Sequence, residues 1–138
     1  MKKASRKYRV LVVEDEPAIS QILTKILVSD GFKVDTALNG LIAKEILVGQ
    51  EYDFCIIDIR TPQMNGIEFY HHLEDKYPKL INGVIFTTGD FLSPNVVSFL
   101  DKVSCPFLPK PFTPNEFRVT LKKAMRFIKN QNGRIPES

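Results

Sequence analysis

Short apolar runs alternate with helical patterns along almost the whole chain, and this alternation constrains the fold more than any other feature. The apolar runs, which predict buried strands, cover residues 10–13, 32–37, 54–57, 84–88 and 106–108. Between them and after the last, apolar side chains recur three or four residues apart, as on one face of a helix. Strict alternation predicts an α/β fold with a parallel sheet covered on both faces. Right-handed crossovers then favour a doubly wound three-layer sandwich of five strands and five helices.

Local signals predict where the helices begin and end. Glycine ends a helix, proline opens or stops one, and a small polar residue caps its first turn. The positions with these signals are Asp30-Gly31, Asn39, Tyr77-Pro78, Ser93-Pro94 and the capping box of Thr113 and Glu116. The predicted inner stripe of the last helix consists of Phe117, Leu121, Ala124 and Ile128.

The length of 138 residues fits one domain, with 43% hydrophobic and 25% charged residues. We expect a folded domain over residues 8–129, a basic N-terminal tail over 1–7 and a C-terminal tail over 130–138. The apolar runs fall short of the roughly 20 residues that span a membrane, and the first nine residues lack a signal-peptide pattern. The two cysteines lie outside metal-ligand or CxxC spacing. These features favour a cytoplasmic protein with buried thiols.

The net charge of +3 arises from basic residues near both ends of the chain. Basic ends can mark a nucleic-acid surface. Here aromatic residues do not alternate with them and a DNA-reading motif is missing from the sequence. We therefore expect no nucleic-acid binding by this chain alone, and no membrane binding.

Chemically active residue types follow four of the predicted strands. Glu14 and Asp15 come after the first strand, Asp58 after the third, Thr88 ends the fourth, and Lys110 follows the fifth. The carboxyl ends of parallel strands meet at one edge of the sheet, where open α/β folds bind ligands. Clustered carboxylates repel one another unless a cation is present, and Mg²⁺ prefers oxygen ligands. Phosphoryl transfer needs positioning and charge neutralisation, and an aspartate can be its nucleophile.

Each of these residues also has a simpler explanation. An acid after a strand is commonly a helix cap, Lys110 alone would be a surface lysine, and Thr88 alone would be a strand former. Their predicted meeting at one edge of one sheet favours a shared site.

The set Glu14-Asp15, Asp58, Thr88 and Lys110-Pro111-Phe112 resembles the signature of the response-regulator receiver family of two-component signalling systems. The resemblance covers about residues 8–129 and implies the strand order 2-1-3-4-5. It implies that Asp58 accepts a phosphoryl group and that Asp15, Asp58, Glu14 (through water) and the Arg60 backbone carbonyl hold Mg²⁺. It further implies that Lys110 contacts the phosphoryl group and that the Lys110–Pro111 bond is cis. Thr87 competes with Thr88 for the hydroxyl role, and Gly89 after Thr88 favours the latter.

Two features qualify the resemblance. The family often has a tyrosine or another aromatic three positions before the lysine, and this chain has Phe107, which predicts a purely steric or weaker aromatic switch. Arg60 and Asp90 occupy the family positions that flank the path of the hydrolytic water. A bulky arginine paired with Asp90 predicts a long-lived phosphoryl group.

The resemblance implies a switch that catalyses its own phosphorylation and dephosphorylation and changes the face of the fourth helix, fifth strand and fifth helix. Its expected partner is a histidine kinase or phosphotransfer protein, with the chain a monomer or weak dimer. The segment 86–90 and residues downstream are similar to receivers of hybrid sensor histidine kinases, and a stand-alone regulator is the alternative. Two further alternatives are a non-phosphorylated scaffold receiver and a flavodoxin-like FMN-binding module. The latter would need a Ser/Thr/Gly-rich loop where the chain has Glu14, Asp15 and Glu16.

Overall fold

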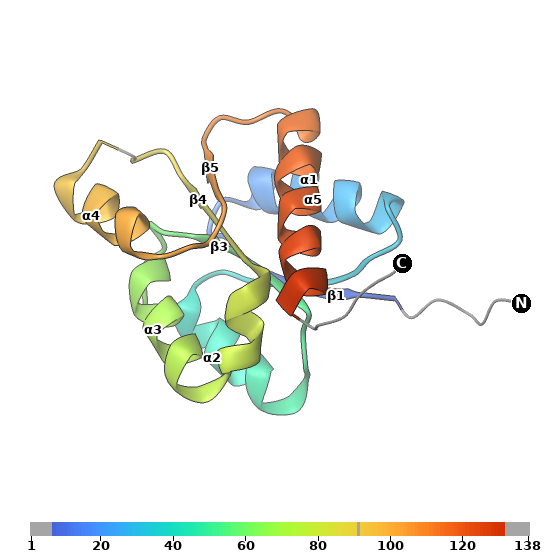
Figure 1. Ribbon diagram of the computed structural model, residues 1–138, viewed down its shortest axis with the longest axis horizontal. Coiled ribbons are helices and arrows are strands. Elements are labelled where there is room, and N and C mark those ends of the chain that lie inside the picture. The colour runs from blue at the N-terminus through green and yellow to red at the C-terminus, as the bar shows by residue number, and fades with distance from the viewer. Residues whose placement is uncertain (1–6, 91, 132–138) are drawn as a thin grey trace, which may run out of the picture.

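The computed structural model describes residues 7–90 and 92–131, in which five parallel strands form one sheet (Figure 1). The strands are β1 (Arg9–Val13), β2 (Lys33–Ala37), β3 (Phe54–Asp58), β4 (Val84–Thr88) and β5 (Phe107–Pro109). Their order in the sheet is β2-β1-β3-β4-β5, and every neighbouring pair is parallel. The predicted fold class and strand order are confirmed.

Five α-helices connect and follow the strands, as predicted. They are α1 (Pro17–Ser29), α2 (Gly40–Gly49), α3 (Gly66–Lys76), α4 (Pro94–Lys102) and α5 (Pro114–Gln131). A 3₁₀ helix, η1 (Pro78–Gly83), fills the connection before β4 and was not predicted. Helix α5 continues two residues past the predicted domain end at 129. Residues 1–6 and 132–138 of the two predicted tails lie outside the described residues.

Alternate side chains of the strands enter two separate cores. Val10 and Val12 pack with the inner sides of α1 and α5, whereas Leu11 and Val13 pack with α2, α3 and α4. A strand buried on both faces must be apolar throughout, which explains the continuous apolar runs in the sequence. Cys55 lies fully inside one core, where burial raises the pKa of its thiol, and Cys105 is partly buried.

The local helix signals act largely as predicted. The side chain of Asn39 accepts a hydrogen bond from the Ile42 amide at 2.9 Å, and Gly31 ends α1 with a φ of 95°. Thr113 and Glu116 exchange both capping-box bonds, at 2.8 and 3.0 Å. Ser93 holds the N-cap position of α4, but its side chain makes no capping hydrogen bond, so proline alone marks that start.

None of the helices in residues 7–90 and 92–131 is both long and apolar enough to cross a membrane.

Candidate functional site

Three of the strands deliver acidic or hydroxyl side chains to the carboxyl edge of the sheet. Glu14 follows β1 directly, Asp58 is the last residue of β3, and Thr88 is the last residue of β4. All three are buried, with Glu14 only 2% and Asp58 only 3% exposed. Oxygen atoms of four carboxylates lie within 4.8 Å of one another, from Glu14, Asp15, Glu16 and Asp58. The expected meeting of the strand-end residues is therefore observed.

Lys110 reaches into this acidic cluster from the loop after β5. Its Nζ lies 3.0 Å from Glu14 Oε1, 2.9 Å from Glu16 Oε1 and 3.2 Å from Asp58 Oδ2. The Lys110 backbone amide donates to the Thr88 carbonyl at 2.9 Å, and this bond holds the backbone of Lys110 beside the end of β4. One ammonium thus neutralises part of the charge of three carboxylates. The Lys110–Pro111 peptide bond is cis, as the resemblance implies.

Burial and mutual repulsion perturb the protonation of the cluster. The pKa of Glu14 rises to about 7, mainly because the carboxyl is buried and secondly because the Asp58 charge is near, while Lys110 opposes the rise. Burial lowers the pKa of Lys110, but its hydrogen bond to Glu16 and the charge of Asp58 outweigh this and leave the pKa above its ordinary value. The cluster is therefore short of positive charge, because a single lysine faces four carboxylates.

The donor set fits a hard divalent cation. Glu14 Oε1 is buried and makes no hydrogen bond, although Lys110 Nζ is only 3.0 Å away. The Glu16 amide donates to the other oxygen, Glu14 Oε2, at 3.1 Å. Oxygen atoms of four carboxylates lie within 4.8 Å of one another beside a single ammonium, and such a cluster of oxygen ligands with excess negative charge fits a divalent cation such as Mg²⁺. Asp15 is less buried than Glu14 and can face such a cation from the solvent side.

The loop after β3 holds the Asp58 carboxylate from its other side. The Arg60 amide donates to Asp58 Oδ1 at 3.2 Å, and the Ile59 amide donates to the Thr87 carbonyl at 3.0 Å. The loop closes where the Gly66 amide donates to the Ile59 carbonyl at 2.9 Å, and α3 begins there. Both Asp58 oxygens are therefore held, one by a backbone amide and one by Lys110.

The two candidate hydroxyls differ in their surroundings. Thr88 Oγ1 accepts a hydrogen bond from the Asp90 amide at 2.9 Å, at the mouth of the loop after β4. Thr87 is the register partner of Asp58, and its buried hydroxyl has no hydrogen-bond partner among the described residues. The Thr88 hydroxyl, being only an acceptor in this contact, keeps its proton available for a ligand oxygen.

Of the three predicted accessory residues, Arg60 and Asp90 lie in the loops beside Asp58 and Thr88, and Phe107 lies on β5. The Arg60 guanidinium forms an ion pair with the Asp90 carboxylate, which joins the loops after β3 and β4. Arg60 is 64% exposed, so the pair lies at the surface. Phe107 lies on β5 as the register partner of Phe86 and is half-buried against the core that α3 and α4 cover.

Glu16 is the residue that the prediction of the site missed. It occupies the N-cap position of α1, but its side chain makes no capping bond and instead pairs with Lys110. Its position directly after Glu14 and Asp15 is the sequence feature that could have indicated a role in the site. The same position, just before a helix, is equally typical of a helix cap.

The chain is matched over residues 10–122 by the family model of the response regulator receiver domain. It therefore belongs to this family, whose members act in two-component signalling. Two relatives are a probable transcriptional regulator, ycf29, of Porphyra purpurea and the transcriptional regulatory protein TctD of Salmonella typhimurium. The chain is 32% identical to the first over 83% of its length and 31% identical to the second over 86%.

Solved structures agree with this assignment. The chemotaxis protein CheY4 of Vibrio cholerae is 27% identical, with a TM-score of 0.77 over 86% of this chain and 99% of that one. The chain spans about half the length of the curated relatives it matches, 55% of ycf29 and 52% of TctD.

Proposed function

We propose that the chain is a phosphorylation-dependent switch that receives a phosphoryl group on Asp58 in the presence of Mg²⁺. One observation carries the proposal: a buried aspartate at the end of the central strand lies among three other carboxylates and 3.2 Å from a lysine ammonium. The donor would be a phosphohistidine of a histidine kinase or phosphotransfer protein. Membership of the receiver family supports this class of donor.

In the transfer, one Asp58 oxygen forms the new bond to phosphorus while the bond from phosphorus to the histidine nitrogen breaks. The histidine leaves with the electron pair of that bond. Arg60 N and Lys110 Nζ orient the Asp58 carboxylate, and Lys110 also offsets the charge of the phosphoryl oxygens. Asp15 and Asp58, with Glu14 through water and the Arg60 carbonyl, would hold Mg²⁺. The ion supplies charge neutralisation to the transferring phosphoryl group.

The output begins at Thr88 in this proposal. Its hydroxyl donates to a phosphoryl oxygen and draws the loop after β4, which the Asp90 amide ties to Thr88, toward Asp58. Phe107 on β5 responds sterically, because phenylalanine has no hydroxyl to hold it at the surface. The face formed by α4, β5 and α5 changes as a result. A single unchanged Phe107 rotamer in crystals with and without a phosphoryl mimic would contradict this part.

The alternatives fit the site less well. A scaffold receiver would not need both Asp58 and Lys110 in contact, and a flavin phosphate would meet four carboxylates rather than a row of free amides. Colourless purified protein would argue against bound flavin. The cytoplasmic location and the choice between a stand-alone regulator and part of a hybrid kinase stay predictions.

We expect one phosphoryl addition when the protein is incubated with acetyl phosphate and Mg²⁺, and none when EDTA removes the metal. The cluster needs added positive charge before a dianionic donor can approach four carboxylates. Intact-mass spectrometry measures the addition, and titration of Mg²⁺ against intrinsic tyrosine fluorescence or NMR shifts measures the metal. If Mg²⁺ neither binds nor promotes the addition, the switch proposal fails and the scaffold alternative takes its place.

Replacing Arg60 with asparagine is expected to shorten the phosphoryl lifetime. The Arg60–Asp90 ion pair joins the two loops beside Asp58 and would obstruct the attacking water. Loss of one exposed ion pair supports a change of about two- to fivefold in the hydrolysis rate. Decay of the intact-mass adduct after donor removal gives the rate. Asp90→Ala should act in the same direction, and unchanged rates in both variants would show that the pair does not restrict water.

A further inference from the structure

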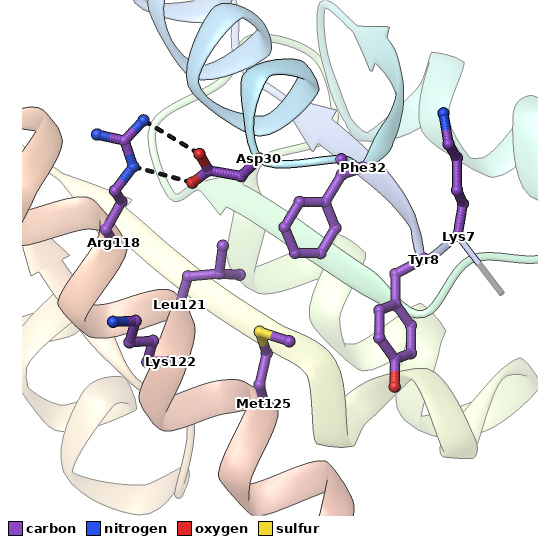
Figure 2. A pocket seen from close by; sticks show the side chains of 9 residues that line it. Lys7, Tyr8, Asp30, Phe32, Arg118, Leu121, Lys122 and Met125 are labelled. Atoms are coloured by element: carbon purple, nitrogen blue, oxygen red, sulfur yellow. Dashed lines mark hydrogen bonds and ion pairs between the residues drawn. The ribbon is translucent and has the colours of Figure 1, made fainter. Parts of the chain in front are cut away.

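A groove lies at the edge of the sheet opposite to the carboxylate cluster. It is formed where α1 ends and β2 begins, by the segment before β1 and by the side of α5 (Figure 2). Its cavity measures about 340 Å³. The groove lies beside the first residues of β1 and β2, whereas Asp58 lies at the last residue of β3. A ligand in the groove would therefore leave the phosphoacceptor accessible.

The floor and walls of the groove are apolar. Figure 2 shows Phe32, Leu121 and Met125 side by side, with Tyr8 at one end. Leu121 and Phe32 are buried, and the Phe32 ring packs against Tyr8 and Phe54 at centroid distances of 6.3 and 6.0 Å. Met125 is partly buried, and a flexible thioether adapts to apolar side chains of different shape. The groove therefore combines buried side chains at its floor with the flexible Met125 side chain at its opening.

The rim of the groove is positively charged. Arg118 holds the Asp30 carboxylate with two bonds of 2.9 and 3.2 Å, so the one acid that lines the groove is already neutralised. Lys7 and Lys122 lie on opposite sides of the apolar side chains (Figure 2). Both are exposed, and neither forms an ion pair within residues 7–90 and 92–131. Two ammonium groups are therefore available to a ligand.

We propose that this groove docks an acidic peptide segment of a partner protein, with one apolar side chain on the floor and flanking carboxylates at Lys7 and Lys122. The charge of the rim selects acidic residues, and the apolar floor selects a side chain that a nucleic-acid backbone does not offer. Phe32 is only 9% exposed, so little of its ring is open to a stacking base. The docking does not depend on phosphorylation of Asp58.

The probe is a fluorescein-labelled peptide in which one phenylalanine is flanked on each side by two glutamates. We expect saturable binding to the full chain, with NMR shifts centered on Phe32, Leu121 and Met125 rather than on Asp58. Lys122→Glu should weaken the affinity by about fivefold or more, because an attractive pair becomes a repulsive one. Lys123→Glu is the matched control, since this exposed neighbour on α5 does not line the groove. It should change the affinity by less than about twofold.

Replacing the phenylalanine of the peptide with serine tests the apolar anchor and should also weaken binding. Phosphorylation of Asp58 by acetyl phosphate should proceed normally in Lys122→Glu, which separates this proposal from the switch proposal. No saturable binding of the peptide would overturn the inference. Equal losses in Lys122→Glu and Lys123→Glu would overturn it too, as would tighter binding of a DNA duplex or of anionic phosphatidylserine vesicles to the same residues.

Discussion

Replacing Asp58 with asparagine is expected to abolish phosphoryl addition at every Mg²⁺ concentration. Asparagine keeps the shape of the side chain and can still accept from the Arg60 amide, but its amide cannot form the acyl phosphate. The change also removes one of four clustered carboxylates, so the thermal midpoint of unfolding should not fall. Intact mass after incubation with acetyl phosphate measures the addition, and circular dichroism checks the fold.

Asp15→Asn is the control that separates an acceptor from a metal ligand. Asp15 lies in the same carboxylate cluster but is less buried than Asp58. Its loss should raise the Mg²⁺ concentration needed for phosphorylation, and excess Mg²⁺ should restore the addition. The Asp58 variant should show no such rescue. A full adduct on Asp58→Asn, or rescue of both variants by Mg²⁺, would place the acceptor elsewhere in the chain.

Much of the fold could be predicted from local sequence patterns, and individual strands and helix starts show why. All five residues of Val84–Thr88 are buried, and the uninterrupted apolar residues Val84, Ile85 and Phe86 are typical of a strand covered on both faces. Asn39 and the pair Thr113–Glu116 satisfy backbone amides at helix starts, and each bond joins residues only three apart. Such short-range chemistry can be read before any tertiary contact is known.

Features that depend on distant contacts could not be predicted in the same way. The 3₁₀ helix η1 forms where the chain must pass from α3 to β4, and a proline stop signal does not specify how that passage is made. Glu16 pairs with Lys110 across 94 residues, and its neighbours in the sequence suggest only a cap. The groove between α1 and α5 combines residues from both ends of the chain. In each case the tertiary arrangement, rather than the local pattern, decides the structure.

Gly66→Ala is expected to destabilise the fold and to slow phosphorylation. A Cβ at this position would lie 2.7 Å from Ile59 Cα, 2.8 Å from the Asp58 carbonyl oxygen and 2.8 Å from Ile57 Cγ2. All three atoms belong to the end of β3 or the residue after it, and two of them are backbone atoms that cannot rotate away. Overpacking of this kind costs about 1–3 kcal/mol, which corresponds to a fall in the midpoint of roughly 3–12 °C.

Gly49→Ala gives the matched control for this prediction. Gly49 ends α2, and a Cβ there would meet nothing within 4 Å. Alanine at an unstrained helical position changes the free energy of unfolding by less than about 1 kcal/mol, in the stabilising direction. Calorimetry measures both variants, and the acetyl phosphate reaction at a temperature where Gly66→Ala is folded measures the displacement of Asp58. A Gly66→Ala protein that is as stable as the wild type and is phosphorylated at the normal rate would contradict this prediction. It would show that the close contact between the start of α3 and the end of β3 is not what positions Asp58.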